Sequence, residues 1–411
     1  MYSYISALPS PAWEQHFPRP TALMGCTGSI GRNTLRVIEA HPELFDVRAL
    51  AGGRNIRLLA EQANRWRPAW LAVQEDGLRQ PLCELLQELA PGYHPEIVAG
   101  QAGYAALAAL PEVTTILSAQ AGASGLRATM AAAEAGKVIC LANKESLVMA
   151  GDLVRAACAR TGAVILPVDS EHNAVFQCLL GRAPETVARV VLTASGGPFR
   201  GKNRDFLATV TPEQALRHPN WSMGAKITID SASMMNKGLE IIEAHHLYGL
   251  PSEQIAVLVH PQSIVHSLVE FADGSLTALL GTPDMRMAIA HCLAWPLCVD
   301  SGIAPLALAG KNVTFEEADT ENFPCLAMAR DILGKGSQYA VALNAANEVA
   351  VLAFLAGQIG FMEIPRLVAR ALDACTAPEP HSLDAILEID RNTRQQTTEA
   401  IQGCRNPNHR N

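Results

Sequence analysis

The chain has 411 residues and a formal net charge of −8 at pH 7, with 49% hydrophobic and 18% charged residues. This length and composition predict a globular protein with two or three domains. The negative charge argues against general affinity for nucleic acid or for an anionic membrane, but it allows a small positive site that binds a phosphorylated metabolite.

The amino terminus and the cysteines indicate the compartment. Residues 1–20 have no basic segment followed by an apolar one, and no apolar run approaches the ~20 residues that span a bilayer. The ten cysteines show no C-x-x-C spacing, and most lie among apolar or small residues, which is typical of reduced core thiols. We therefore expect a cytoplasmic protein. Because residues 1–20 contain four prolines, we expect them to form an irregular arm.

A nucleotide-binding pattern follows this arm. A predicted strand at 22–24 leads into a turn with Gly25, Gly28 and Gly31, and apolar residues at helical spacing follow at 33–40. In this context, backbone N–H groups and a helix amino terminus hold a pyrophosphate. The spacing is G-x-x-G-x-x-G and not the standard G-x-G-x-x-G, so an ordinary tight turn is the alternative.

Further strands are predicted in alternation with helices, which indicates a doubly wound domain that ends near residue 168. These strands lie at 45–51, 70–73, 96–100, 114–118, 138–142 and 163–168. Gly53, Arg54 and Asn55 follow the first of them, where an NAD site usually offers a carboxylate. Arginine instead suits the 2′-phosphate of NADPH, although a surface arginine that caps a turn is the alternative.

Polar residues also follow the strand at 138–142, where ligands of open α/β sheets usually bind. Lys144 is therefore a candidate site residue, and Asn143 before it is a candidate helix N-cap. A solvated helix start would explain both residues as well.

Three carboxylates suggest a metal site. Asp169 and Glu171 come after the strand at 163–168, and Glu240 lies downstream beside Asn236 and Lys237. Together they can hold a hard divalent cation against an anionic, oxygen-rich substrate, whereas an isolated acidic pair usually lies in a solvated loop. If residues 231–240 are helical, Asn236 and Glu240 share one face, and Lys237 pairs with Glu240.

Beyond residue 168, long polar loops separate the strands predicted at 190–194 and 226–230. Ser195 begins a Ser-Gly-Gly segment that either holds an oxyanion or forms an ordinary turn. Residues 218–224, which we call the lid loop, carry Trp221 between polar neighbours and would exclude water from a substrate. The alternatives are a core tryptophan and a purely structural His218.

Eight motifs connect the chain to one known family, in whose order they occur across nearly the whole sequence. They are GCTGSIG at 25–31, LANKES at 141–146, PVDSEH at 167–172, ASGGPF at 194–199, HPNWSMG at 218–224, MMNKGLE at 234–240, HPQSIVHS at 260–267 and LNAANE at 343–348. On these motifs the chain resembles the 1-deoxy-D-xylulose 5-phosphate reductoisomerases, which make 2-C-methyl-D-erythritol 4-phosphate for isoprenoid synthesis. It departs from the family at Arg54, where lysine is frequent, and in its longer arm.

The resemblance implies an NADPH-dependent oxidoreductase that also needs Mn²⁺, Mg²⁺ or Co²⁺, bound by Asp169, Glu171 and Glu240. It implies catalytic roles for Lys144, Glu171, His218 and Trp221. The implied substrate ligands are Lys144, Ser170, Glu171, Ser195, His218, Ser231, Asn236, Lys237 and Glu240. The implied cofactor contacts are Thr27, Gly28, Ser29, Ile30, Gly53, Arg54, Asn55, Asn143, Glu145, Gly224 and Met285.

We thus expect an α/β protein with a Rossmann-like NADPH-binding domain at 21–168 and an α+β catalytic domain with its lid loop at 169–295. A linker at 296–320 and a carboxyl-terminal helical bundle at 321–411 would follow, and the family implies a homodimer. Two other hypotheses differ in class. A simple NADP-dependent dehydrogenase would not need three carboxylates, and a nucleotide-sensing protein would not need Lys237, Glu171 and the lid.

Overall fold

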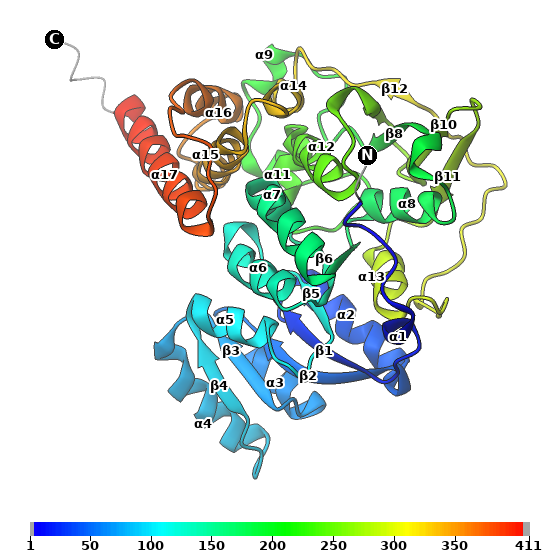
Figure 1. Cartoon of the computed structure of the whole chain (residues 1–411). Helices are drawn as coiled ribbons and strands as arrows, with labels where there is room; N and C mark the ends of the chain where they lie inside the picture. The colour runs from blue at the N-terminus through cyan, green and yellow to red at the C-terminus, as the bar shows by residue number, and fades with distance from the viewer. Residues whose placement is uncertain (1–3, 406–411) are drawn as a thin grey trace.

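The computed structural model describes residues 4–405, and it describes side chains up to residue 403. A seven-stranded sheet in the order β4-β3-β2-β1-β5-β6-β7 forms the amino-terminal half, and all its neighbouring strands are parallel (Figure 1). The strands are β1 (Arg19–Met24), β2 (Phe45–Ala51), β3 (Trp70–Val73), β4 (Glu96–Ala99), β5 (Thr115–Ser118), β6 (Val138–Leu141) and β7 (Val164–Pro167).

Two helical layers cover this sheet. Helices α2 (Ser29–Ala40), α3 (Ile56–Trp66) and α4 (Arg79–Leu89) share one apolar core with it, and α5 (Gly100–Ala108), α6 (Leu126–Glu134) and α7 (Lys144–Thr161) share another. Burial on both faces explains why the strands are almost continuously apolar. The strand order reverses between β1 and β5, and such a switch point is where ligands of this fold bind.

A second, mixed sheet of five strands has the order β11-β10-β8-β9-β12. Its strands are β8 (Val187–Ala194), β9 (Ile255–Val259), β10 (Val265–Phe271), β11 (Leu276–Leu280) and β12 (Glu316–Glu317). The helices of this region are α8 (Ser170–Leu179), α9 (Arg204–Leu207), α10 (Pro212–Ala215), α11 (Ala225–Ala232), α12 (Met235–Tyr248) and α13 (Met285–Ala294). Helix α8 contacts β10 and β11, so it joins this sheet to the end of β7.

The carboxyl-terminal bundle consists of α14 (Cys325–Ile332), α15 (Ser337–Leu355), α16 (Glu363–Asp373) and α17 (Leu383–Arg405). Helix α15 is long and apolar enough to cross a membrane by length and composition, with a mean hydropathy of 1.2 over an 18-residue window, but 67% of that window is buried. The prediction that no apolar run approaches the spanning length was therefore wrong. Because α15 contacts α7, α16 and α17, its apolar surface is that of a core helix.

The amino-terminal arm differs from its prediction. It contains the short helix α1 (Pro11–Glu14), and β1 begins at Arg19, inside the segment expected to be irregular. The side chain of Arg19 is fully buried, and its guanidinium lies 3.5 Å from the Trp13 ring centroid. It also donates to the backbone oxygen of Leu293. The Trp13 contact holds the arm against β1, and the Leu293 contact joins β1 to α13.

The strand predicted at 226–230 is also wrong, because these residues lie in helix α11. Alternating β-branched residues suggested a strand, but Gly224 caps a helix here, and Lys226 pairs with Asp230 one turn later. The helix expected at 231–240 is divided between α11 and α12, since Met234 adopts a left-handed conformation with φ 61°. The segment expected to be a linker contains β12, which pairs with β9.

Candidate active site

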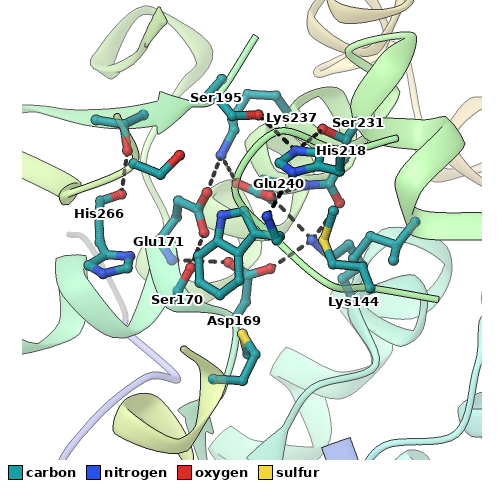
Figure 2. Close-up of a pocket in the computed structure, with 18 of the residues that line it drawn as sticks. Lys144, Asp169, Ser170, Glu171, Ser195, His218, Ser231, Lys237, Glu240 and His266 are labelled. Atoms are coloured by element: carbon teal, nitrogen blue, oxygen red, sulfur yellow. Dashed lines mark hydrogen bonds and ion pairs between the residues drawn. The ribbon is translucent and has the colours of Figure 1, made fainter. Parts of the chain in front are cut away.

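A cavity lies beyond the carboxyl ends of β6 and β7, between the first sheet, the lid loop and α12. Figure 2 shows side chains from these elements pointing into the same space. Predicted site residues that line the cavity are Ser29, Ile30, Lys144, Asp169, Ser170, Glu171, Ser195, His218, Trp221, Gly224, Ser231, Asn236, Lys237, Glu240 and Met285. The fold thus collects residues from distant parts of the chain around one space.

Three carboxylates and two lysines form one part of the cavity, which we call the carboxylate end: Asp169, Glu171, Glu240, Lys144 and Lys237. The ammonium of Lys144 lies 2.7 Å from Asp169 Oδ2 and 3.2 Å from Glu240 Oε1. The ammonium of Lys237 donates to Glu171 Oε1 at 2.9 Å and also to Glu240. Asp169 caps α8, and Lys237 and Glu240 share a face of α12. Local helix geometry therefore sets the positions of these three side chains.

Burial and charge shift the protonation of this group. Burial would lower the pKa of Lys144, but the neighbouring Asp169 and Glu240 outweigh it and raise that pKa well above its usual value. Burial would raise the pKa of Asp169, yet Lys144 holds it well below its usual range. The pKa of Glu171 is raised, first by burial and then by the nearby Glu240. Of the two carboxylates Asp169 and Glu171, Glu171 is therefore the more basic.

The carboxylate end fits a divalent cation. Ligand atoms of Asp169, His172 and Glu240 lie within 4.8 Å of one another, and three carboxylates against two ammonium groups leave negative charge to neutralise. The sequence prediction did not include His172, whose Nε2 lies 3.0 Å from Glu243 Oε2. The Glu171 carboxylate accepts hydrogen bonds from Ser170 Oγ at 2.5 Å and from Lys237. To bind a cation, the Glu171 side chain would rotate away from these two donors.

Ser195, His218 and Ser231 form the other part of the cavity, which we call the hydroxyl end. His218 Nε2 lies 3.0 Å from Ser195 Oγ and 3.1 Å from Ser231 Oγ. Its Nδ1 accepts hydrogen bonds from the backbone N–H groups of Asn220 and Trp221, so the proton of the neutral ring lies on Nε2. Burial lowers the pKa of His218, which favours this neutral form. The hydroxyl end therefore presents uncharged donors.

Close backbone approach holds the hydroxyl end together. Gly197 has φ +68°, and a Cβ atom there would lie 2.7 Å from the backbone oxygen of Ser231. Its N–H donates to Ser195 Oγ at 3.1 Å. The Ser-Gly-Gly segment thus needs glycine to bring β8 against α11.

The lid loop crosses the cavity, and Trp221 lies on it half-buried. The Trp221 and His266 rings meet edge to face with centroids 6.2 Å apart. Asn220 Nδ2 donates to Pro261 O at 2.6 Å and to Ser263 Oγ at 2.8 Å, which ties the base of the loop to the segment before β10. Trp221 is therefore neither a free surface residue nor a core residue.

Comparison with known proteins identifies the family. Residues 21–151 match the model described as 1-deoxy-D-xylulose 5-phosphate reductoisomerase, and residues 165–248 and 280–396 match two models of its carboxyl-terminal domain. The reductoisomerase of Lawsonia intracellularis is 59% identical over 403 residues, covering 98% of this chain and 100% of the relative. The chain belongs to the 1-deoxy-D-xylulose 5-phosphate reductoisomerase family.

Solved reductoisomerases share this fold. A crystal structure of DOX-P reductoisomerase in complex with NADPH, fosmidomycin and magnesium has a TM-score of 0.89 and 42% identity, covering 93% of this chain and 98% of that one. The Zymomonas mobilis enzyme in complex with NADPH has a TM-score of 0.86 and 42% identity, with coverages of 93% and 99%. These findings confirm the predicted family and fold class.

The predicted cofactor contacts fall into two groups. Ser29, Ile30, Gly224 and Met285 line the cavity, whereas the described positions of Thr27, Gly28, Gly53, Arg54, Asn55, Asn143 and Glu145 are outside its lining. Gly28 caps α2, and Asn55 caps α3 by accepting from Leu58 N–H at 3.1 Å. Asn143 accepts from Ser146 N–H as the predicted N-cap of α7. Of the outer residues, Thr27 and Gly28 follow β1, which borders the switch point, and Gly53, Arg54 and Asn55 follow the adjacent strand β2.

Sequence reasoning missed several lining residues. They are Asn33, Ala142, Thr193, Ala194, Gly196, Ser222, Ile227, Met234, Ser263, Val265 and His266. His266 had a signal, because it belongs to the HPQSIVHS motif at 260–267. The positive φ of Met234 and Ser263 carries no sequence signal, since both are ordinary side chains in a strained conformation.

Proposed function

We propose that this chain converts 1-deoxy-D-xylulose 5-phosphate into 2-C-methyl-D-erythritol 4-phosphate, with NADPH as reductant and a divalent cation. The observation that carries this function is the meeting of the carboxylate end and the hydroxyl end in one cavity at the switch point of a Rossmann-like sheet. A relative with this fold binds NADPH, fosmidomycin and magnesium together.

Asp169, Glu171 and Glu240 would hold the cation. Bound there, it acts as a Lewis acid that polarises the substrate's carbonyl and hydroxyl oxygens. Without it, Lys144 and Lys237 balance these carboxylates, as the distances of 2.7 Å and 2.9 Å to Asp169 and Glu171 show. The two lysines keep the anionic site from repelling an anionic substrate.

The hydroxyl end would bind the substrate's phosphate. Ser195, Ser231 and the Nε2–H of His218 are neutral donors that converge within 3.1 Å of the imidazole. Asn236 and Lys237 complete this role in our proposal, although both also bond to Glu240. Donors fixed in advance bind an anion without reorganising, so the phosphate would anchor the substrate while its carbon skeleton rearranges.

Lys144, Ser170 and Glu171 would act at the reacting carbons. Lys144 can donate to the carbonyl or hydroxyl oxygens, and Ser170 can orient a hydroxyl from its position at the start of α8. Glu171 would accept the proton that leaves the substrate hydroxyl when the carbon–carbon bond breaks, because its carboxylate lies in the cavity beside Ser170, at the start of α8. Trp221 would cover the substrate and exclude water, which protects the intermediate aldehyde before its reduction.

NADPH would bind along the switch point. Its pyrophosphate would lie at the amino terminus of α2, beside Thr27, Gly28, Ser29 and Ile30, where backbone N–H groups are free of intrahelical partners. Gly53, Arg54 and Asn55 would bind the 2′-phosphate after β2. Met285 and Gly224 would contact the nicotinamide end, since both line the cavity next to the lid loop.

We further propose a homodimer that covers an apolar surface. Strand β11 is the edge of the second sheet, and its Leu276 and Leu280 are 58% and 40% exposed. Exposed apolar side chains beside an unpaired strand edge favour pairing with a second copy. We expect sedimentation to give twice the chain mass, and Leu276→Glu to shift it toward the monomer.

A cytoplasmic location is the last part of the proposal. All cysteines whose side chains are described are free thiols, and most of them are buried. Their state suits a reducing compartment.

The decisive experiment mixes the purified protein with deoxyxylulose phosphate, NADPH and Mn²⁺ and follows NADPH oxidation. The proposal predicts turnover that a chelator abolishes. Turnover of a hydroxy acid that persists with chelator would support a simple dehydrogenase. NADPH binding without turnover of any ketose phosphate would support a nucleotide sensor.

A further inference from the structure

A second polar cluster lies behind the cavity. Lys226 Nζ is 2.7 Å from Glu145 Oε1 and 3.0 Å from Asp230 Oδ2. The other oxygen of the Glu145 carboxylate accepts from Asn143 Nδ2 at 3.0 Å. Asp230 Oδ1 accepts from Asn347 Nδ2 at 2.8 Å, which connects the cluster to α15. Both carboxylates are buried, and the Lys226 side chain is 25% exposed.

This cluster holds both ends of the cavity. Glu145 follows Lys144, whose ammonium belongs to the carboxylate end. Lys226 precedes Ile227, which lines the cavity, and its helix α11 continues to Ser231 of the hydroxyl end. The ion pair between Lys226 and Glu145 therefore joins α11 to the first turn of α7.

Charge balance favours a fixed geometry for this pair. Burial would lower the pKa of Lys226, but Asp230 and Glu145 outweigh it and raise that pKa above its usual range. Burial would likewise raise the pKa of Glu145, and Lys226 reverses the shift. Both groups therefore stay charged at neutral pH, and separating them would leave charges without a partner in a buried place.

We propose that Lys226 is a positioning residue that sets the distance between the carboxylate end and the hydroxyl end of the cavity, acting through Glu145. This inference rests on the proposed reductoisomerase function. Each end keeps its own internal bonds without the pair, since Ser195, His218 and Ser231 bond to one another, as do Lys144, Asp169 and Glu240. Loss of the pair would thus leave binding at each end intact and misalign the ends.

The test is made at saturating NADPH, because the resemblance also implies that Glu145 contacts the cofactor. It compares kcat, KM for the ketose phosphate and the Mn²⁺ activation constant in Lys226→Gln, Glu145→Gln and the double variant of the full-length enzyme. We expect kcat to fall about 10- to 100-fold in each single variant, because a misplacement of about 1 Å costs up to about 10²-fold. KM and the Mn²⁺ constant should stay within about threefold. The double variant should be no slower than the slower single variant, since the two residues act as one unit. Lys226→Arg should restore most of kcat.

The control is an exposed ion pair at the other end of α7, between Arg160 and Glu134. Arg160→Gln should leave all three constants unchanged. The inference is overturned if Lys226→Gln and Glu145→Gln lower the melting temperature but keep wild-type kcat, or if their effects on kcat multiply in the double variant. If Lys226→Gln does not fold, Glu145→Gln and Lys226→Arg decide between the same outcomes. Absence of turnover in the wild-type protein would instead reject the proposed function.

Discussion

The two ends of the cavity use opposite strategies to handle an anionic substrate. The carboxylate end is densely charged, and Lys144 lies 2.7 Å from Asp169 Oδ2 while Lys237 lies 2.9 Å from Glu171 Oε1. The hydroxyl end contains no charged side chain among Ser195, His218 and Ser231, and burial lowers the pKa of its histidine. The difference teaches that a cation site and a phosphate site can share one cavity when the carboxylates have their own lysine partners and most of the phosphate donors, apart from Lys237, are neutral.

Removing the metal should have the largest effect on turnover. We expect a chelator to abolish turnover, because Asp169, Glu171 and Glu240 would then be balanced by their lysines alone. Added Mn²⁺ or Mg²⁺ should restore it. Circular dichroism should show an unchanged fold, since the bonds among Ser195, His218 and Ser231 of the hydroxyl end do not involve the cation. Turnover at full rate in chelator would contradict the assignment of the carboxylate end.

Glu240→Gln should have the next largest effect. This carboxylate is fully buried and accepts from Lys144 and Lys237, so the amide would weaken both the cation site and the lysine positions. We expect kcat to fall on the order of 10²- to 10³-fold, which is typical when one preorganised electrostatic group is lost. NADPH affinity, measured by fluorescence titration, should be nearly unchanged. The exposed Glu134→Gln serves as the matched control, and equal activity of both variants would refute the prediction.

His218→Ala should act on the hydroxyl end alone. Loss of the Nε2–H donor removes a hydrogen bond to a charged phosphate, worth about 1.5–3 kcal/mol, so kcat/KM for the substrate should fall about 10- to 100-fold. The Mn²⁺ activation constant should not change. A shift in metal activation as large as the loss in kcat/KM would show that the two ends are not separate.

The smallest effect concerns stability and pH. The folded pKa of His218 is lowered by burial, so its stabilising contribution is fully present above the unfolded value of about 6.5 and declines as pH falls toward the folded value. Thermal unfolding at a series of pH values should therefore show that wild-type protein loses more stability on acidification than His218→Gln. Parallel curves for the two proteins would contradict this.

Much of the first domain follows from local sequence. The apolar runs of β2, β3 and β6 and the glycine turn before α2 predicted the sheet and its switch point, because strands buried on both faces need continuous apolar residues. The helix spacing of Asn236, Lys237 and Glu240 predicted their pairing, and the structure confirms the bonds within that face.

Other features depended on tertiary contacts that sequence does not reveal. Residues 226–230 alternate like a strand, but Gly224 caps a helix before them and Lys226 pairs with Asp230 one turn later. His172 lies beside the carboxylates because α8 turns it toward α12, and no spacing rule predicted that contact. Arg19 packs against Trp13 of the arm and donates to the backbone oxygen of Leu293, which lies far along the chain.

The central claim is that three carboxylates from α8 and α12 bind one cation within the cavity. Electron paramagnetic resonance of Mn²⁺ titrated into the protein tests it most directly, because free and bound ions give different signals. The account predicts saturable binding at a single site per chain, which Asp169→Asn and Glu240→Gln each weaken and the exposed Glu134→Gln does not. Equal Mn²⁺ binding by all four proteins would contradict it.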